Sequence, residues 1–107
     1  MHKSMNMGGS IVSKNILEKK GRIKWCFREK GVNNIDNGWR FLSEIDTDSF
    51  LSDSNNMVVC DWGTIFEIEP AIASIFDLPI GTELTLKYDV SQKYFVYSET
   101  GEKFAMH

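Results

Sequence analysis

The acidic side chains of this chain are concentrated in one segment. Between Phe41 and Leu86 lie nine carboxylates and no lysine or arginine. The first forty residues have nine lysines or arginines against three acids, so the net charge of −3 hides a basic segment followed by an acidic one. Paired carboxylates can act as general acid and base or hold Mg²⁺. Sorted charge also indicates an electrostatic contact, inside the fold or with a partner. The nine carboxylates are Glu44, Asp46, Asp48, Asp53, Asp61, Glu67, Glu69, Asp77 and Glu83.

Two interpretations of these carboxylates stay open from the residues alone. In the first, Asp36, Glu44 and Asp61 form the centre of a metal-dependent hydrolase. In the second, the acidic residues form a solvated face that performs no reaction. A calcium loop at residues 46–48 is disfavoured, because Phe50 and Leu51 interrupt the spacing that an EF-hand requires.

Histidine and cysteine chemistry has little support in this sequence. The histidines are His2 and His107, at the two ends of the sequence, whereas catalytic triads and metal sites hold imidazole in a rigid shell. Cys26 and Cys60 lack a CxxC spacing, and we interpret them as buried, reduced thiols. Our leading interpretation therefore has no metal, no cofactor and no catalytic residue, and the metal-dependent hydrolase stays as its alternative.

The basic segment contains aromatic residues, a combination typical of nucleic-acid-binding proteins. Alternation over residues 22–28 predicts a strand on which Ile23, Trp25 and Phe27 face the core, while the cations and Cys26 face outward. The rings then lie on the opposite side from the cations. The pI near 5.3 also disfavours a polyanionic partner. We therefore predict no nucleic-acid partner.

Residues 36–41 (DNGWRF) are the densest group of special residues in the chain. Gly38 allows a turn ahead of a strand, and Asp36 can accept a backbone N–H there or pair with an arginine. On that strand Trp39 and Phe41 share one face and Arg40 takes the other. We favour a structural corner in which both rings enter the core and Arg40 pairs with a nearby acid.

The order of predicted elements indicates an α+β fold. We expect a single domain with a mainly antiparallel sheet and one or two short helices. Residues 1–9 are predicted as a flexible leader and residues 10–107 as the domain. Strands are predicted at residues 10–13, 22–28, 39–43, 57–62, 83–88 and 94–97.

Three of these elements have specific sequence support. The nearly continuous apolar run at residues 57–62 predicts a central strand covered on both faces. Asp46 or Thr47 is expected to cap a short helix that includes Phe50 and Leu51. The clearest helix is predicted to open at Glu69-Pro70 and to continue to residue 76, because its apolar residues share one stripe.

Nothing in the sequence predicts a membrane segment. The chain lacks an apolar run of the ~20 residues that a spanning helix requires. Its start lacks the apolar core of a signal peptide. We therefore expect a cytoplasmic protein with no membrane partner.

Residues 34–41 also carry the most specific part of a family resemblance. Over roughly residues 9–86 the chain resembles a family of small bacterial proteins that is catalogued as a domain of unknown function and grouped with immunity proteins of polymorphic toxin systems. It departs from the family pattern at Glu44-Ile45-Asp46, where the family has a glycine-containing acidic turn, and from Lys87 onward. The other matching positions are Gly9–Ser13, Arg28-Glu29, Asp46-Thr47-Asp48, Asn55-Asn56, Asp61, Thr64-Ile65, Pro70 and Pro79–Thr82.

The resemblance implies a non-enzymatic protein that binds and neutralises a toxin. Nuclease toxins are commonly basic because they hold polyanions, so a carboxylate-rich face would suit such a partner. Trp39 and Arg40 are further candidates, with Trp39 counting only if it is exposed. A metal-dependent hydrolase and a regulatory or scaffolding domain are the alternatives, and the oligomeric state is not indicated. The acidic partner-binding candidates are Asp46, Asp48, Asp53, Asp61 and Glu67.

Overall fold

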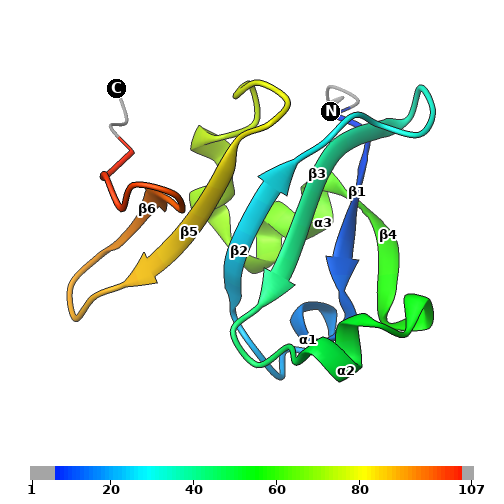
Figure 1. Cartoon of the computed structure of the whole chain (residues 1–107), viewed down its shortest axis with the longest axis horizontal. Coiled ribbons are helices and arrows are strands. Elements are labelled where there is room, and N and C mark those ends of the chain that lie inside the picture. The colour runs from blue at the N-terminus through cyan, green and yellow to red at the C-terminus, as the bar shows by residue number, and fades with distance from the viewer. Residues whose placement is uncertain (1–6, 105–107) are drawn as a thin grey trace.

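Six strands form one sheet with the order β4-β1-β3-β2-β5-β6 in the computed structural model, which describes residues 7–104 (Figure 1). β1 and β3 run parallel, and the other neighbouring strands are antiparallel. The predicted α+β fold with a mainly antiparallel sheet is confirmed. The strands are β1 (Gly9–Ser13), β2 (Ile23–Arg28), β3 (Asp36–Ser43), β4 (Met57–Asp61), β5 (Glu83–Tyr88) and β6 (Lys93–Tyr97).

The helices leave one face of the sheet uncovered. α3 (Trp62–Ile68) and the 3-10 turn η2 (Pro70–Ser74) lie behind the strands in Figure 1. The shorter α1 (Lys14–Leu17), α2 (Asp48–Leu51) and η1 (Ser54–Asn56) lie at its lower end as drawn. Among residues 7–104 no helix crosses the near face, which we call the open face. By strand register the open face carries Ile11, Trp25, Phe27, Arg40, Leu42, Val59, Thr85, Lys87, Tyr94 and Val96.

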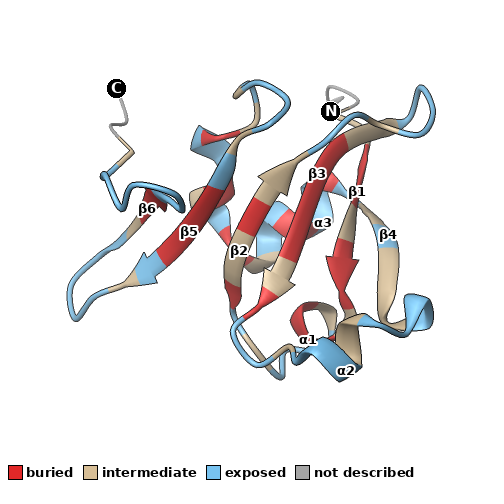
Figure 2. Cartoon of the chain, viewed as in Figure 1, coloured by how far each residue is buried: buried red, intermediate tan, exposed pale blue. Residues whose placement is uncertain are grey.

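The core lies between the covered face of the sheet and the α3–η2 segment, and Figure 2 shows buried residues along β3 and β5. The rings of Trp39 and Phe41 stack with centroids 6.2 Å apart. Phe41 contacts Trp62 at 5.8 Å, and Trp62 meets Phe76 edge-on at 4.8 Å. Burial of Trp39 and Phe41 on one face is therefore confirmed.

β4 is an edge strand, so the prediction of a central strand at residues 57–62 is wrong. Within residues 7–104 it pairs only with β1, and Val59 is 76% exposed. The strand stops at Asp61, whose carboxylate accepts a hydrogen bond from the Thr64 N–H at 3.1 Å and so caps α3. Trp62 therefore begins a helix instead of ending a strand. An apolar run alone does not show whether its last residue ends a strand or begins a helix.

The predicted helix at residues 69–76 is also corrected. Pro70 starts the short 3-10 turn η2, and the longest helix is α3, just before it. Thr47 caps α2 by accepting the Phe50 N–H at 3.1 Å, which is one of the two predicted caps. Asp46 makes a different set of contacts, described below.

A bulge in β2 reverses the faces predicted for that strand. Ile23 pairs with Ser43 but Trp25 pairs with Leu42, so Lys24 is an extra residue. After the bulge Cys26 faces the core and is 1% exposed, while Trp25 and Phe27 turn to the open face. The prediction that the two rings enter the core is therefore wrong.

Gly38 lies inside β3, where a turn was predicted. Its φ is +89°, and a Cβ at this position would lie 2.1 Å from the carbonyl oxygen of Glu29. The β1–β3 register also shifts between Gly9 and Ile11, so the strand is irregular here. Only glycine fits both the left-handed backbone and the close approach.

The first described residues belong to the ordered domain. Gly9 begins β1 and Met7 packs against the core, although both were predicted as part of a flexible leader. The remaining leader positions, residues 1–6, lie outside the described residues. No helix among residues 7–104 has the length and apolarity needed to cross a membrane.

Candidate interaction surface

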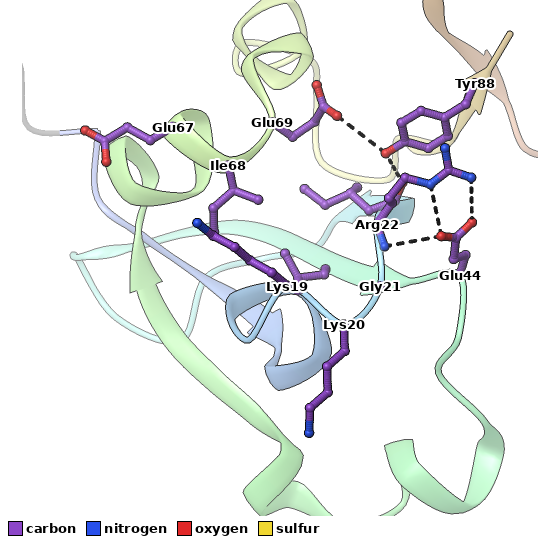
Figure 3. Close-up of a pocket in the computed structure, with 11 residues that line it drawn as sticks. Lys19, Lys20, Gly21, Arg22, Glu44, Glu67, Ile68, Glu69 and Tyr88 are labelled. Carbon is purple, nitrogen blue, oxygen red and sulfur yellow. Dashed lines mark hydrogen bonds and ion pairs between the residues drawn. The ribbon is translucent and has the colours of Figure 1, made fainter. Parts of the chain in front are cut away.

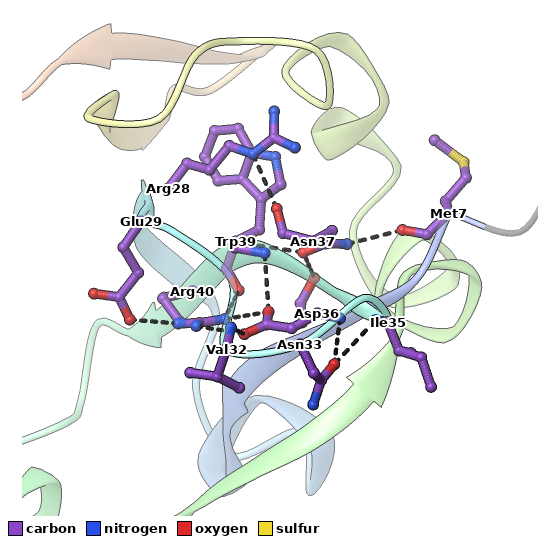
Figure 4. A network of polar contacts seen from close by, with 12 residues as sticks. Met7, Arg28, Glu29, Val32, Asn33, Ile35, Asp36, Asn37, Trp39 and Arg40 are labelled. Atoms are coloured by element: carbon purple, nitrogen blue, oxygen red, sulfur yellow. Dashed lines mark hydrogen bonds and ion pairs between the residues drawn. The ribbon is translucent and has the colours of Figure 1, made fainter.

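A paired arginine lies in the middle of the open face. Arg40 is 3% exposed, and its two Nη groups donate to the two oxygens of Asp36 at 2.8 Å each (Figure 4). Its Nε donates to Glu29 at 2.7 Å. Asp36 also accepts the backbone N–H groups of Val32 and Gly38, both at 2.9 Å. Asp36 therefore both accepts backbone N–H groups and pairs with an arginine, the two roles considered for it. Arg40 pairs with nearby acids, as predicted.

This network holds its charges fixed at neutral pH. The Arg40 guanidinium lowers the pKa of Asp36 well below its usual range, and the two backbone N–H groups act in the same direction against burial. The Asp36 carboxylate in turn raises the pKa of Arg40. A carboxylate held ionised in a bidentate pair is suited to positioning the backbone and not to proton transfer.

Arg28 supports the same region from the covered side of the sheet, as Figure 4 also shows. Its Nη1 donates to the carbonyls of Phe76 at 3.1 Å and Leu78 at 2.7 Å, and its Nε donates to the carbonyl of Asn37. The indole N–H of Trp39 donates to the same Phe76 carbonyl at 3.1 Å. Arg28 was predicted to face outward, but it joins β2 to the segment that follows η2.

Two of the predicted partner-binding residues are engaged inside the chain. Trp39 is 0% exposed and lies in the aromatic core. It was a partner-binding candidate only if exposed, so it is no longer one. Arg40 is almost fully covered and is neutralised by its two carboxylates. Neither side chain offers a surface to a partner.

Asp46, Asp48 and Asp53 lie near the start of β4. Asp46 is half-buried, and its oxygens accept hydrogen bonds from Ser13 Oγ, Asn15 Nδ2 and the Ser43 N–H at 2.8–2.9 Å. It therefore joins the ends of β1 and β3. Asp48 is exposed in the first turn of α2, and Asp53 is exposed and caps η1.

Asp61 and Glu67 lie at the other end of β4 and on α3. Asp61 is the last residue of β4, and Thr64 lowers the pKa of its carboxyl through its hydroxyl and its N–H. Glu67 is exposed on α3. β4 thus separates the five predicted carboxylates into two groups, and their role in partner binding stays a prediction.

Among the described residues, only one ion pair joins the basic and the acidic segments. Arg22 donates to both oxygens of Glu44 at 3.0 Å and stacks on the ring of Tyr88, 4.0 Å from its centroid (Figure 3). The charge sorting seen in the sequence is therefore not neutralised by pairing within the chain.

These residues border a polar hollow of about 530 Å³. The Tyr88 hydroxyl donates to the carbonyl of Ile23 at 2.7 Å, and burial together with the nearby Glu69 raises the pKa of that hydroxyl. Glu69 is 6% exposed and pairs with Lys93 at 3.1 Å. Each buried polar group here already has a partner in the chain, so the hollow has no free ligand-binding group of that kind.

The carboxylates of the proposed hydrolase do not share a centre. Asp36 and Glu44 lie at opposite ends of β3, each paired with its own arginine, while Asp61 caps α3. Within residues 7–104 no three His, Cys, Asp or Glu side chains lie close enough to hold a metal. Cys26 is buried, which agrees with its interpretation as a buried thiol but not with the outward direction predicted by strand alternation, and burial raises the pKa of its thiol. Cys60 is half-buried.

The aromatic residues of the open face were not predicted from the sequence. Trp25, Phe27 and Tyr94 are half-buried there, and no helix among the described residues covers them. Strict alternation assigned the first two to the core. Nothing in the sequence around Lys24 was sufficient to predict the bulge at that residue.

Comparison with known proteins adds the family. The chain matches the Immunity protein Imm33 domain over residues 10–96, which reaches from β1 into β6. No curated protein and no solved structure gives a significant match. The match covers well over half of the chain and agrees with the resemblance carried by residues 34–41. The chain therefore belongs to the Imm33 family of immunity proteins.

Proposed function

We propose that this protein acts in the cytoplasm, where it binds a cognate protein toxin and blocks its activity without performing a reaction itself. The observation that carries the proposal is the immunity-protein family match across residues 10–96. An immunity role implies a protein toxin as partner. It also favours binding over catalysis, in keeping with carboxylates that lie apart and are individually paired or capping.

Exposed carboxylates support a basic partner. Of the nine acidic residues between Phe41 and Leu86, Glu44 and Glu69 form ion pairs, and Asp46 is occupied by hydrogen bonds. The other six have no ion pair among the described residues. Solvent-exposed carboxylates speed association with a positively charged protein. These six are Asp48, Asp53, Asp61, Glu67, Asp77 and Glu83.

The test is protection of a bacterial host. The toxic domain of a secreted protein encoded beside this gene is expressed from an inducible promoter, with and without this protein. We expect growth only when the two are co-expressed, and co-purification of the pair. Growth arrest that this protein does not relieve, together with no co-purification, would contradict the proposal and favour a regulatory or scaffolding role.

The acidic contribution is tested separately. The double variant Asp48→Lys/Asp53→Lys reverses two exposed carboxylates that make only local capping contacts. We expect about a tenfold slower association with the toxic domain at low salt and a weaker salt dependence. The matched control is Glu99→Lys/Glu102→Lys, which makes the same charge change in the turn after β6, outside the acidic segment. Equal effects from both variants would show that only net charge matters.

A further inference from the structure

The open face carries three aromatic rings that the core does not use. Trp25 and Phe27 turn to this side because of the bulge at Lys24, and Tyr94 joins them from β6. Trp25 pairs in register with Leu42 on β3 and with Thr85 on β5. Trp25 and Phe27 therefore lie near the middle of the sheet, and Tyr94 lies on β6 at one end of the strand order. A partner's surface can cover all three from the open side.

An apolar row continues from these rings to the edge of the sheet. Phe27 lies opposite Arg40, Arg40 opposite Ile11, and Ile11 opposite Val59. Arg40 is buried between the carboxylates of Asp36 and Glu29, so this position in the row is a paired charge cluster whose outer member, Glu29, is exposed. Val59 ends the row at 76% exposure. The aromatic and aliphatic residues on the two sides of this cluster are of the kind found in the core of a protein interface.

Three lysines surround the aromatic part of the open face. The Nζ of Lys24 lies 4.9 Å from the ring centroid of Trp25, and the Nζ of Lys103 lies 4.7 Å from that of Tyr94. Lys87 lies opposite Tyr94 in the β5–β6 register. Within the described part of the chain none of the three forms an ion pair. Their ammonium groups are therefore open to carboxylates of a partner.

The charges favour a protein over a nucleic acid on this surface. Exposed rings next to lysines also occur in proteins that bind single strands. Here Glu29 and Glu83 lie beside Phe27, Asp89 follows β5, and the chain as a whole carries −3, so a continuous phosphate backbone meets repulsion. A protein surface can place its own carboxylates at three points and leave the rest apolar.

We infer that the open face is the contact that determines affinity for the toxin, and that it takes a protein surface with an apolar centre and carboxylates facing Lys24, Lys87 and Lys103. This inference rests on the proposed function. The molecule measures 36 × 33 Å across its two longer axes, which Figure 1 views face-on, and a standard interface needs about 800 Å² per partner. Aromatic side chains dominate affinity, whereas the acidic ends of β4 steer association.

The test measures binding of the toxic domain encoded by the adjacent gene to purified full-length variants. Lys87→Glu/Lys103→Glu is expected to raise Kd at least tenfold, because the new carboxylates repel those of the partner. The matched control Lys19→Glu/Lys20→Glu makes the same charge change on exposed lysines at the turn after α1. It is expected to change Kd less than threefold.

A second variant tests the aromatic centre. Trp25→Ala is expected to raise Kd at least tenfold mainly through faster dissociation. Its folding is checked by far-UV circular dichroism, and if it does not fold, the lysine variants decide the question alone. Near-wild-type Kd for the lysine variant would overturn the inference, whatever the control does.

The same experiment separates the two proposals. If the wild type binds the toxin and both open-face variants bind it equally well, the inference is wrong and the proposed function still stands. Absence of wild-type binding and of protection sinks both. A 20-nucleotide oligo-dT is measured in parallel, and tight binding that Lys87→Glu/Lys103→Glu abolishes would overturn the inference in favour of a nucleic-acid surface.

Discussion

The covered and the open faces of the sheet both carry aromatic side chains, but the rings have different neighbours. On the covered face Trp39, Phe41 and Trp62 pack ring against ring. On the open face Trp25 and Tyr94 lie under lysine ammonium groups, and no ring–ring pair is found there among the described residues. One face thus supplies stability through packing, and the other keeps its rings available to a partner.

The largest expected effect compares two phenylalanines on neighbouring strands. Phe41→Ala removes a fully buried ring and is expected to lower the free energy of unfolding by about 3–5 kcal/mol. Phe27→Ala removes a half-buried ring on the open face and is expected to cost about 1 kcal/mol, roughly half of the transfer term for burying a ring. Urea denaturation measures both. Equal losses would mean that the open face is packed as tightly as the core.

Arg40 is the exception on the open face, because it is a buried charge. Arg40→Met leaves Asp36 without its main partner and is expected to lower the free energy of unfolding by about 3 kcal/mol. Arg22→Met breaks the exposed pair with Glu44 and is expected to lower the free energy of unfolding far less, because water screens an exposed ion pair. The two variants are compared by urea denaturation at pH 7. A loss at Arg22 as large as that at Arg40 would show that burial of the pair does not set its contribution.

Stability should fall in acid through the same pair. The folded pKa of Asp36 lies below its unfolded value of ~3.9, so this contribution is complete above that value and is lost as pH falls toward the folded pKa. Asp36→Asn is expected to lower the thermal midpoint at pH 7 and to flatten its decline below about pH 4. The midpoint is measured from pH 2 to 7. An unchanged acid decline in the variant would assign the acid sensitivity to other carboxylates.

The smallest expected effect concerns the helix that makes one face covered. Asp61→Ala removes the cap of α3 and is expected to lower the free energy of unfolding by about 1 kcal/mol. Asp77→Ala is the matched control, because Asp77 is exposed and its side chain forms no hydrogen bond or ion pair within residues 7–104. Its expected effect is within about 0.5 kcal/mol. If both variants behave alike, the Asp61–Thr64 contacts contribute little.

Local patterns predicted the parts of this fold that local chemistry decides. The β5–β6 hairpin, the Thr47 cap and the burial of Trp39 and Phe41 all follow from neighbouring residues. At the candidate site the pairing of Arg40 with an acid was predicted for the same reason. Its partner Asp36 is only four residues away.

Features set by contacts distant in sequence were not predictable from the same patterns. The bulge at Lys24 places Cys26 in the core, and it is defined by the pairing of β2 with β3, a strand that lies further along the chain. An apolar run could not reveal that β4 is an edge strand, since its place depends on β1, which pairs with it from almost fifty residues away. The open face escaped prediction because a single extra residue exchanges the two sides of a strand.

The strand order also bears on how the chain is completed during synthesis. β1, β2, β3 and β4 are neighbours in the sheet and come from the first 61 residues. β5 then pairs with β2, and β6 pairs with β5. While the last third of the chain is still in the ribosome, β2 is a temporary edge with a row of unpaired backbone N–H and C=O groups. A chain that stops before Glu83 keeps that edge open and is prone to pair with another copy.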